Sequence, residues 1–85
     1  MPTLKVIRVN NFIQTYLRDH NLLSITPVEI ARELDDASVL NDSKTRPGLP
    51  LRNLIRHGSI EGAWQDESRR WHIDMVKEHA EKYSI

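Results

Sequence analysis

The stretch Thr26-Pro27-Val28-Glu29-Ile30-Ala31-Arg32-Glu33-Leu34 carries the clearest local signal in the sequence. Thr26 suits a helix N-cap, the proline after it suits the first helical position, and Glu29 completes a capping box three residues after the cap. Ile25 and Ile30 lie on either side of the cap as a hydrophobic staple. We therefore expect a helix of about two turns that begins at this proline and ends at the last leucine. The residues available to the core are Val28, Ala31 and Leu34.

A second short helix is expected over 51–57, because Pro50 precedes this segment and Gly58 follows it, the usual asymmetry of helix ends. Its core-facing residues would be Leu51, Leu54 and Ile55. Four polar residues would stay outside: Arg52, Asn53, Arg56 and His57. The connection over 35–48 is rich in turn-forming residues and long for a compact domain. It is expected to be a functional loop or to contain a helical turn near 38–40.

The segments on either side complete the expected fold. A β-hairpin is predicted over 60–73, with Asp66-Glu67-Ser68 at its turn and two tryptophans that pack it onto the helices. Near the N-terminus we expect a strand or an ordered arm over 3–9, then a helix from Asn10 to about His20. After the hairpin, Asp74 is expected to cap a last helix that ends near Tyr83.

Composition excludes several classes of protein. The 85 residues have room for one domain over 1–85, and the lack of cysteine excludes a disulfide framework, a thiolate nucleophile and a cysteine-ligated zinc site. No apolar run reaches the ~20 residues of a membrane helix, and no secretory signal is visible. We therefore expect a cytoplasmic protein without membrane contact. Because the common catalytic and metal-binding motifs are absent from the sequence, we expect no enzyme activity, no metal and no cofactor.

Positive and negative charges are separated along this chain, whose net charge is zero. Residues 44–59 contain four basic residues and no acidic one, whereas 29–42 contain one basic residue and five acidic ones. The side chains of arginine and asparagine make paired hydrogen bonds to phosphates or base edges, so the basic segment suits a nucleic acid. The candidate DNA-binding residues are Lys44, Arg46, Arg52, Asn53, Arg56, Arg69 and Arg70.

The order of the expected elements is that of a winged helix-turn-helix: a helix, a connection, a basic second helix and a two-stranded hairpin. We therefore expect a small α+β winged helix-turn-helix domain with additional N- and C-terminal helices. In this fold the second helix enters the major groove of DNA, and the hairpin, called the wing, reaches phosphates or the adjacent minor groove.

The same segments resemble a known family. The stretch from Thr26 to Leu34 resembles the first helix of the DNA-binding unit in excisionases and MerR-like regulators. Leu51 to Ala63 resembles their recognition helix and its exit into the wing, and Arg69-Arg70-Trp71-His72-Ile73 resembles the return strand of the wing. The resemblance covers about 25–73.

This resemblance implies sequence-specific binding of double-stranded DNA. The protein would be a small transcriptional regulator or a recombination directionality factor, bacterial or phage-encoded. Arg52, Asn53 and Arg56 would face the major groove, and Arg69 and Arg70 would meet the backbone or the minor groove. Because one monomer offers few contacts, we also expect a homodimer or cooperative assembly on DNA, through the apolar stripes of the first and last helices.

Two features depart from the family: the long connection over 35–48, and Asp66 and Glu67 at the wing tip, which would repel phosphate. They leave a rival interpretation open, a protein-binding module or small inhibitor built on a winged-helix fold, with the acidic stretch as its partner surface. A third interpretation is the N-terminal domain of a longer recombinase or nuclease. A salt series distinguishes the DNA-binding interpretation from the protein-binding one, because DNA binding weakens steeply as the salt concentration rises.

Overall fold

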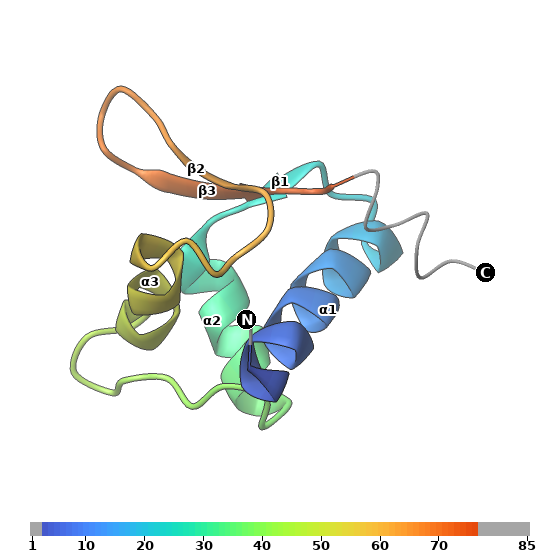
Figure 1. The fold of residues 1–85 in the computed structure, drawn as a ribbon, viewed down its shortest axis with the longest axis vertical. Helices are drawn as coiled ribbons and strands as arrows, with labels where there is room; N and C mark the ends of the chain where they lie inside the picture. Colours follow the sequence, from blue (N-terminus) through green and yellow to red (C-terminus); the bar gives the residue numbers. More distant parts are fainter. Residues whose placement is uncertain (1–2, 77–85) are drawn as a thin grey trace.

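The computed structural model describes residues 3–76, so the expected last helix, which would end near Tyr83, falls largely outside the described residues. Over 3–76 the chain forms three α-helices and a three-stranded antiparallel sheet (Figure 1). The elements in chain order are α1 (Leu4–Asp19), β1 (Ser24–Ile25), α2 (Pro27–Asp36), α3 (Leu49–Arg56), β2 (Ala63–Gln65) and β3 (Trp71–Asp74). The expectation of a small α+β domain is confirmed.

Helix α1 begins at Leu4, so the expectation of a strand or arm over 3–9 is wrong. Thr3 is the N-cap, and its Oγ1 accepts a hydrogen bond from the backbone N–H of Val6 at 3.3 Å. The β-branched residues of this segment fall at helical spacing, and burial of one face outweighs their weak preference for strands. The fully buried residues of that face are Val9, Ile13 and Leu17. Asn10 therefore lies inside α1 and does not cap a helix.

Helix α2 has the predicted capping box at Thr26 and Glu29, and it ends at Asp36, two residues later than expected. Its buried face consists of Pro27, Ile30, Ala31 and Leu34. Val28 is 53% exposed, so the prediction that it faces the core is wrong. It lies one position, about 100° of helical turn, away from the buried stripe.

Helix α3 begins at Leu49, two residues earlier than expected, and buries Leu51 and Ile55 as predicted. Gly48 precedes it with a left-handed φ of 84°, and its N–H donates a hydrogen bond to Asp42 Oδ1 at 2.8 Å. The N–H of Asp42 donates in turn to Asp35 Oδ1 at 3.1 Å. Residues 37–48 contain no helical turn, and carboxylates of the acidic stretch hold this connection in shape.

The predicted hairpin forms between β2 and β3, in the register Trp64 opposite His72. A third strand, β1, was not predicted; it pairs with the other edge of β3, where Ile25 lies opposite Ile73. Both isoleucines are buried and join the sheet to the helical core. Asp74 is the last residue of β3, so it does not begin a helix as expected.

Two buried amides of α1 hold the base of this hairpin. Asn10 donates to the carbonyl of Ser59 and accepts from the N–H of Glu61, both at 2.9 Å. Gln14 donates to the carbonyl of Asp74 at 3.1 Å and accepts from the N–H of Val76 at 2.8 Å. Both ends of the hairpin are therefore bonded to one helix far away in sequence.

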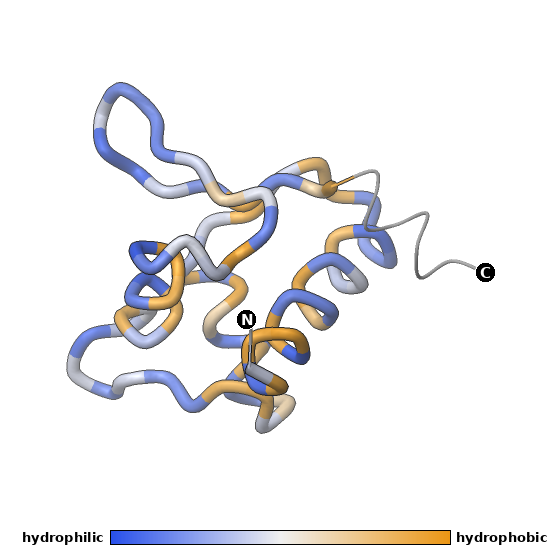
Figure 2. Tube along the Cα trace, viewed as in Figure 1, coloured by the Kyte–Doolittle hydropathy of each residue, from blue (hydrophilic) through white to orange (hydrophobic). Residues whose placement is uncertain are grey.

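Apolar residues recur along each helix, whereas the loop between β2 and β3 is almost entirely hydrophilic (Figure 2). Within residues 3–76, none of the helices has the length and apolar character that crossing a bilayer requires.

Replacement of Gln14 by alanine tests the bonds to the hairpin base. Gln14→Ala leaves a part-buried N–H and a carbonyl of the hairpin without a partner, so we expect the free energy of unfolding to fall by about 2 kcal/mol. Urea denaturation measures this change. Thr15→Ala on the exposed side of α1 is the control and should change the stability by less than about 0.5 kcal/mol. Equal stability of the two variants would contradict the role of Gln14.

Candidate functional site

Three predicted site residues meet at one surface depression of about 390 Å³. Arg52 reaches it from α3, and Arg69 and Arg70 reach it from the loop between β2 and β3. The remaining lining residues are Thr26, Pro27, Val28 and Trp71. None of the described residues that line it is acidic. The depression therefore presents three cationic side chains beside the N-terminus of α2, where the helix dipole also favours an anion.

Arg52 contributes a hydrogen-bond donor that has no acceptor among the described residues. Its side chain is half-buried, and its Nε is shielded from solvent and has no hydrogen-bond partner within residues 3–76. Buried polar atoms are rarely left unpaired, because the missing hydrogen bond costs about 1–3 kcal/mol. Arg56 follows four residues later, so the two guanidinium groups lie on neighbouring positions of one helix face.

The loop that carries Arg69 and Arg70 is organised around Asp66. The Oδ1 atom of Asp66 accepts hydrogen bonds from the N–H of Ser68 at 2.8 Å and of Arg70 at 2.9 Å. Its Oδ2 lies 2.8 Å from His72 Nε2, on β3. The backbone closes the turn as well, since Asp66 N–H donates to the carbonyl of Arg70 at 2.9 Å. One carboxylate therefore joins both sides of the loop.

Arg69 has a left-handed backbone, with a φ of 65°. This is the position of a short hairpin loop at which glycine is favoured, because a side chain there costs about 1–2 kcal/mol. An arginine at this position is held by its neighbours: its N–H donates to the carbonyl of Asp66 at 3.0 Å, and its carbonyl accepts from Gln65 Nε2 at 3.0 Å. Neither Arg69 nor Arg70 lies in a strand, because β3 begins at Trp71, two residues later than the stretch that resembles a return strand.

The carboxylate of Asp66 is stabilised in its ionised form. The hydrogen bond with His72, followed by the N–H of Arg70, lowers the pKa of Asp66 below its ordinary value of 3.8. Glu67 next to it is exposed, and no hydrogen bond or ion pair involves its side chain within residues 3–76.

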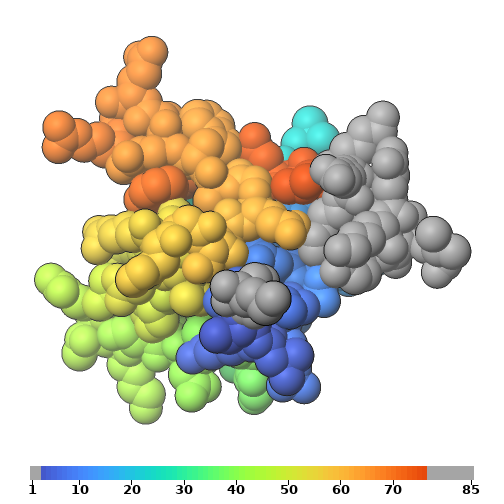
Figure 3. Space-filling model, in the orientation of Figure 1, coloured from blue at the N-terminus to red at the C-terminus, as the bar shows by residue number. Residues whose placement is uncertain are grey.

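The other predicted residues are exposed but lie outside the lining of the depression. Asn53 and Arg56 are on the solvent side of α3, and Lys44 and Arg46 are on the connection that leads into it. Figure 3 shows this connection, α3 and the hairpin along one side of the molecule, with the surface of α1 on the other side. Within residues 3–76 the ion pairs are Arg18–Asp19 and His72–Asp66, so all six basic candidates are unpaired.

Two contributors to the depression were not predicted: the N-terminus of α2, through Thr26 and Pro27, and Trp71. The capping box that identified α2 also signals where its N-terminus lies, so that part could be found from the sequence. Trp71 packs on the core as expected, but Trp64 is 46% exposed and stacks on His72, with ring centroids 4.6 Å apart. The expectation that both tryptophans pack on the helices is therefore wrong for Trp64.

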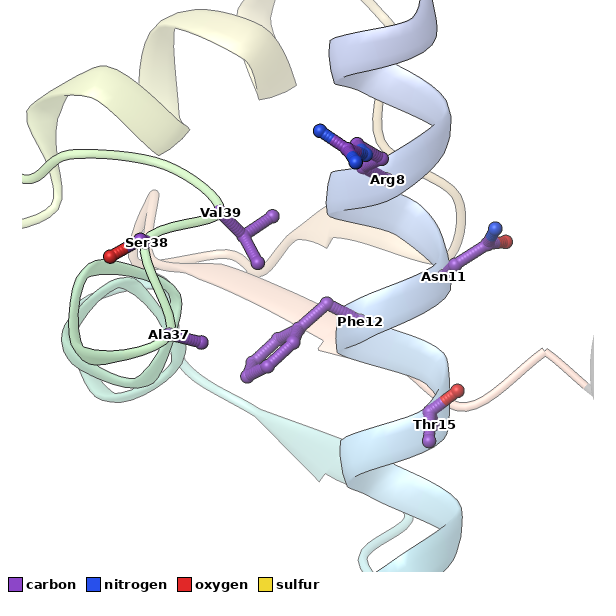
Figure 4. Close-up of a pocket in the computed structure, with 7 residues that line it drawn as sticks. All are labelled: Arg8, Asn11, Phe12, Thr15, Ala37, Ser38 and Val39. Carbon is purple, nitrogen blue, oxygen red and sulfur yellow. The ribbon is translucent and has the colours of Figure 1, made fainter.

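A second hollow, of about 470 Å³, lies between α1 and the residues that follow α2 (Figure 4). Phe12, Ala37 and Val39 point toward one another across it, and Arg8 lies at one end. It contains one basic side chain and has an apolar floor, unlike the arginine-lined depression.

Comparison with known protein families, with curated proteins and with solved structures finds no match. Within residues 3–76 no group of three or more histidine, aspartate and glutamate side chains is placed to hold a metal ion.

Replacement of Arg69 by glycine tests the strain in the loop. Because glycine adopts a positive φ freely, Arg69→Gly should raise the free energy of unfolding by about 0.5–1 kcal/mol. Arg70→Gly is the matched control, since the φ of Arg70 is not positive; it should lower the stability by about 0.5–1 kcal/mol. Urea denaturation of both variants measures the difference. A loss of stability in Arg69→Gly would show that its backbone is not strained.

The lowered pKa of Asp66 predicts a pH dependence of stability. Because the pKa is lower in the folded state than in the unfolded state, ionised Asp66 stabilises the fold above its ordinary pKa of 3.8. This contribution is lost as the pH falls through the folded-state pKa. Asp66→Asn should therefore lose less stability than the wild type between about pH 6 and about pH 2.5, measured by urea denaturation. Equal losses would contradict the assignment.

Proposed function

We propose that this protein binds double-stranded DNA as a winged helix-turn-helix, with α3 in the major groove and the loop between β2 and β3 on the sugar–phosphate backbone. The observation that carries the proposal is the convergence of Arg52, Arg69 and Arg70 on one depression. They come from two elements that DNA would have to contact together. The resemblance of the sequence to excisionases and MerR-like regulators suggests a role in transcriptional regulation or in recombination.

The topology supports this proposal. The elements follow the order helix, strand, helix, helix and hairpin, and the short first strand pairs with one edge of β3. This order is compatible with a wing that lies beside a recognition helix. A helix of eight residues is about 12 Å long and fits across a major groove about 12 Å wide. On its exposed side, Arg56 can donate two hydrogen bonds to a guanine edge, and Asn53 can donate one to adenine N7 and accept one from the adenine N6 amino group.

The charge distribution also supports DNA. Lys44 and Arg46 extend the basic surface beyond α3, and both are exposed and unpaired within residues 3–76. The acidic residues Asp35 and Asp42 are engaged in shaping the connection. In the loop, Asp66 is bonded internally. These contacts give Asp35, Asp42 and Asp66 a structural role in the segments that carry the basic side chains.

A second candidate function is a protein-binding module on the same fold. The hollow beside Phe12 and Val39 favours it, because its apolar floor suits a side chain of a partner or of a second copy of this chain. This hollow is lined by α1 and by residues 37–39, which follow α2, and α3 and the hairpin do not contribute to it. Dimerisation there would leave α3 and the hairpin free for DNA.

Fluorescence anisotropy of a labelled random-sequence duplex tests the DNA proposal. The wild type should bind at low salt and weaken steeply as salt rises. Arg52→Ala/Arg56→Ala should weaken binding by about tenfold or more and reduce the slope of log K against log salt by about 1 for each of the two arginines that neutralises a phosphate.

Lys5→Ala/Arg8→Ala is the control, because it removes two exposed positive charges from α1, which contributes no residue to the depression. It should bind nearly as well as the wild type. Circular dichroism checks that all three proteins are folded. If the folded wild type does not bind at low salt, or if both double variants lose affinity equally, the proposed interface is wrong.

A further inference from the structure

We propose that Asp66 is a positioning residue for DNA binding, so that removing this negative charge from the wing tip weakens the affinity for a polyanion. This inference rests on the proposed function. Simple electrostatics gives the opposite expectation, because loss of an acidic residue from a DNA-facing loop normally strengthens binding.

The geometry gives Asp66 control over both arginines. Its carboxylate bonds to the N–H of Arg70 and to that of Ser68, and through His72 it is fixed to β3. Arg69 lies between these anchored positions in a left-handed conformation that an arginine rarely adopts unaided. Both arginines thereby reach the depression that Arg52 lines from α3.

Removal of the carboxylate would release this arrangement. Two backbone donors and one imidazole would lose their acceptor, while the unfavourable φ of Arg69 would remain. The loop would then relax to other conformations, in which Arg69 and Arg70 no longer converge with Arg52. Ordering these side chains again on DNA costs free energy, so the complex would weaken.

The N–H groups and the imidazole that surround Asp66 stabilise its ionised carboxylate, which lowers its pKa. The negative charge therefore stays in the loop, and its repulsion of a polyanion opposes the positioning effect. Glu67 provides the comparison within the same loop. It is exposed and its side chain makes no hydrogen bond or ion pair within residues 3–76, so its removal changes the charge without changing the loop.

The experiment compares Asp66→Ala with Glu67→Ala by anisotropy with the same labelled duplex, over a series of salt concentrations. We expect Glu67→Ala to bind equally or up to about threefold more tightly, with an unchanged salt slope. Asp66→Ala should bind about five- to tenfold more weakly, with a slope reduced by about 1–2 as arginine–phosphate contacts are lost. Asp66→Asn keeps an oxygen acceptor for the two N–H groups and should recover part of the affinity.

The outcomes either support or contradict the positioning role of Asp66. A reduced slope in Asp66→Ala, with partial recovery in Asp66→Asn, supports positioning, because a partly unfolded sample would lose active protein without a change in slope. If the wild type binds and Asp66→Ala binds as tightly as Glu67→Ala, the role of Asp66 is wrong while DNA binding stands. If the folded wild type binds no duplex at low salt, the proposed function falls and this inference falls with it.

Discussion

The bonds from Asn10 and Gln14 to the base of the hairpin are the constraint on which the rest of the arrangement depends. These two side chains are less than a tenth exposed, and together they bond to the backbone both before β2 and after β3. A hairpin alone is marginally stable in water, and its direction relative to the helices would not be fixed. Because α1 holds both of its ends, and β1 holds the edge of β3, the loop between β2 and β3 lies on the same side of the molecule as α3 (Figure 1).

The acidic residues take on a structural role that the net charge conceals. Asp35 and Asp42 shape the connection before α3, and Asp66 shapes the loop that carries Arg69 and Arg70. Their oxygens accept hydrogen bonds from backbone N–H groups that have no carbonyl partner in these irregular segments. A chain with zero net charge can thus present a surface of unpaired basic side chains while its acidic groups maintain the backbone that positions them.

The parts of the fold that depend on local chemistry could be predicted from the sequence, and those that depend on distant partners could not. The capping box of α2 and the proline and glycine around α3 are local signals, and both helices form. The sequence predicts a strand at the start of α1 because the β-branched residues there favour strands locally. Their burial against α2 and the sheet stabilises a helix instead. Strand β1 is two residues long and exists only through pairing with β3. Among the site residues, Arg52, Arg69 and Arg70 were found by charge, but their convergence depends on Asp66, which the sequence presented as a repulsive group.

We propose that DNA contacts one contiguous surface, made by the connection before α3, α3 itself and the loop between β2 and β3. Titration of isotope-labelled protein with a short duplex, followed by the amide resonances in NMR spectra, tests it most directly. If this surface contacts DNA, the largest shifts will fall on residues 44–57 and 66–71, and on the N-terminus of α2 beside the depression. Shifts concentrated around Phe12 and Val39, or no shifts at low salt, would contradict it.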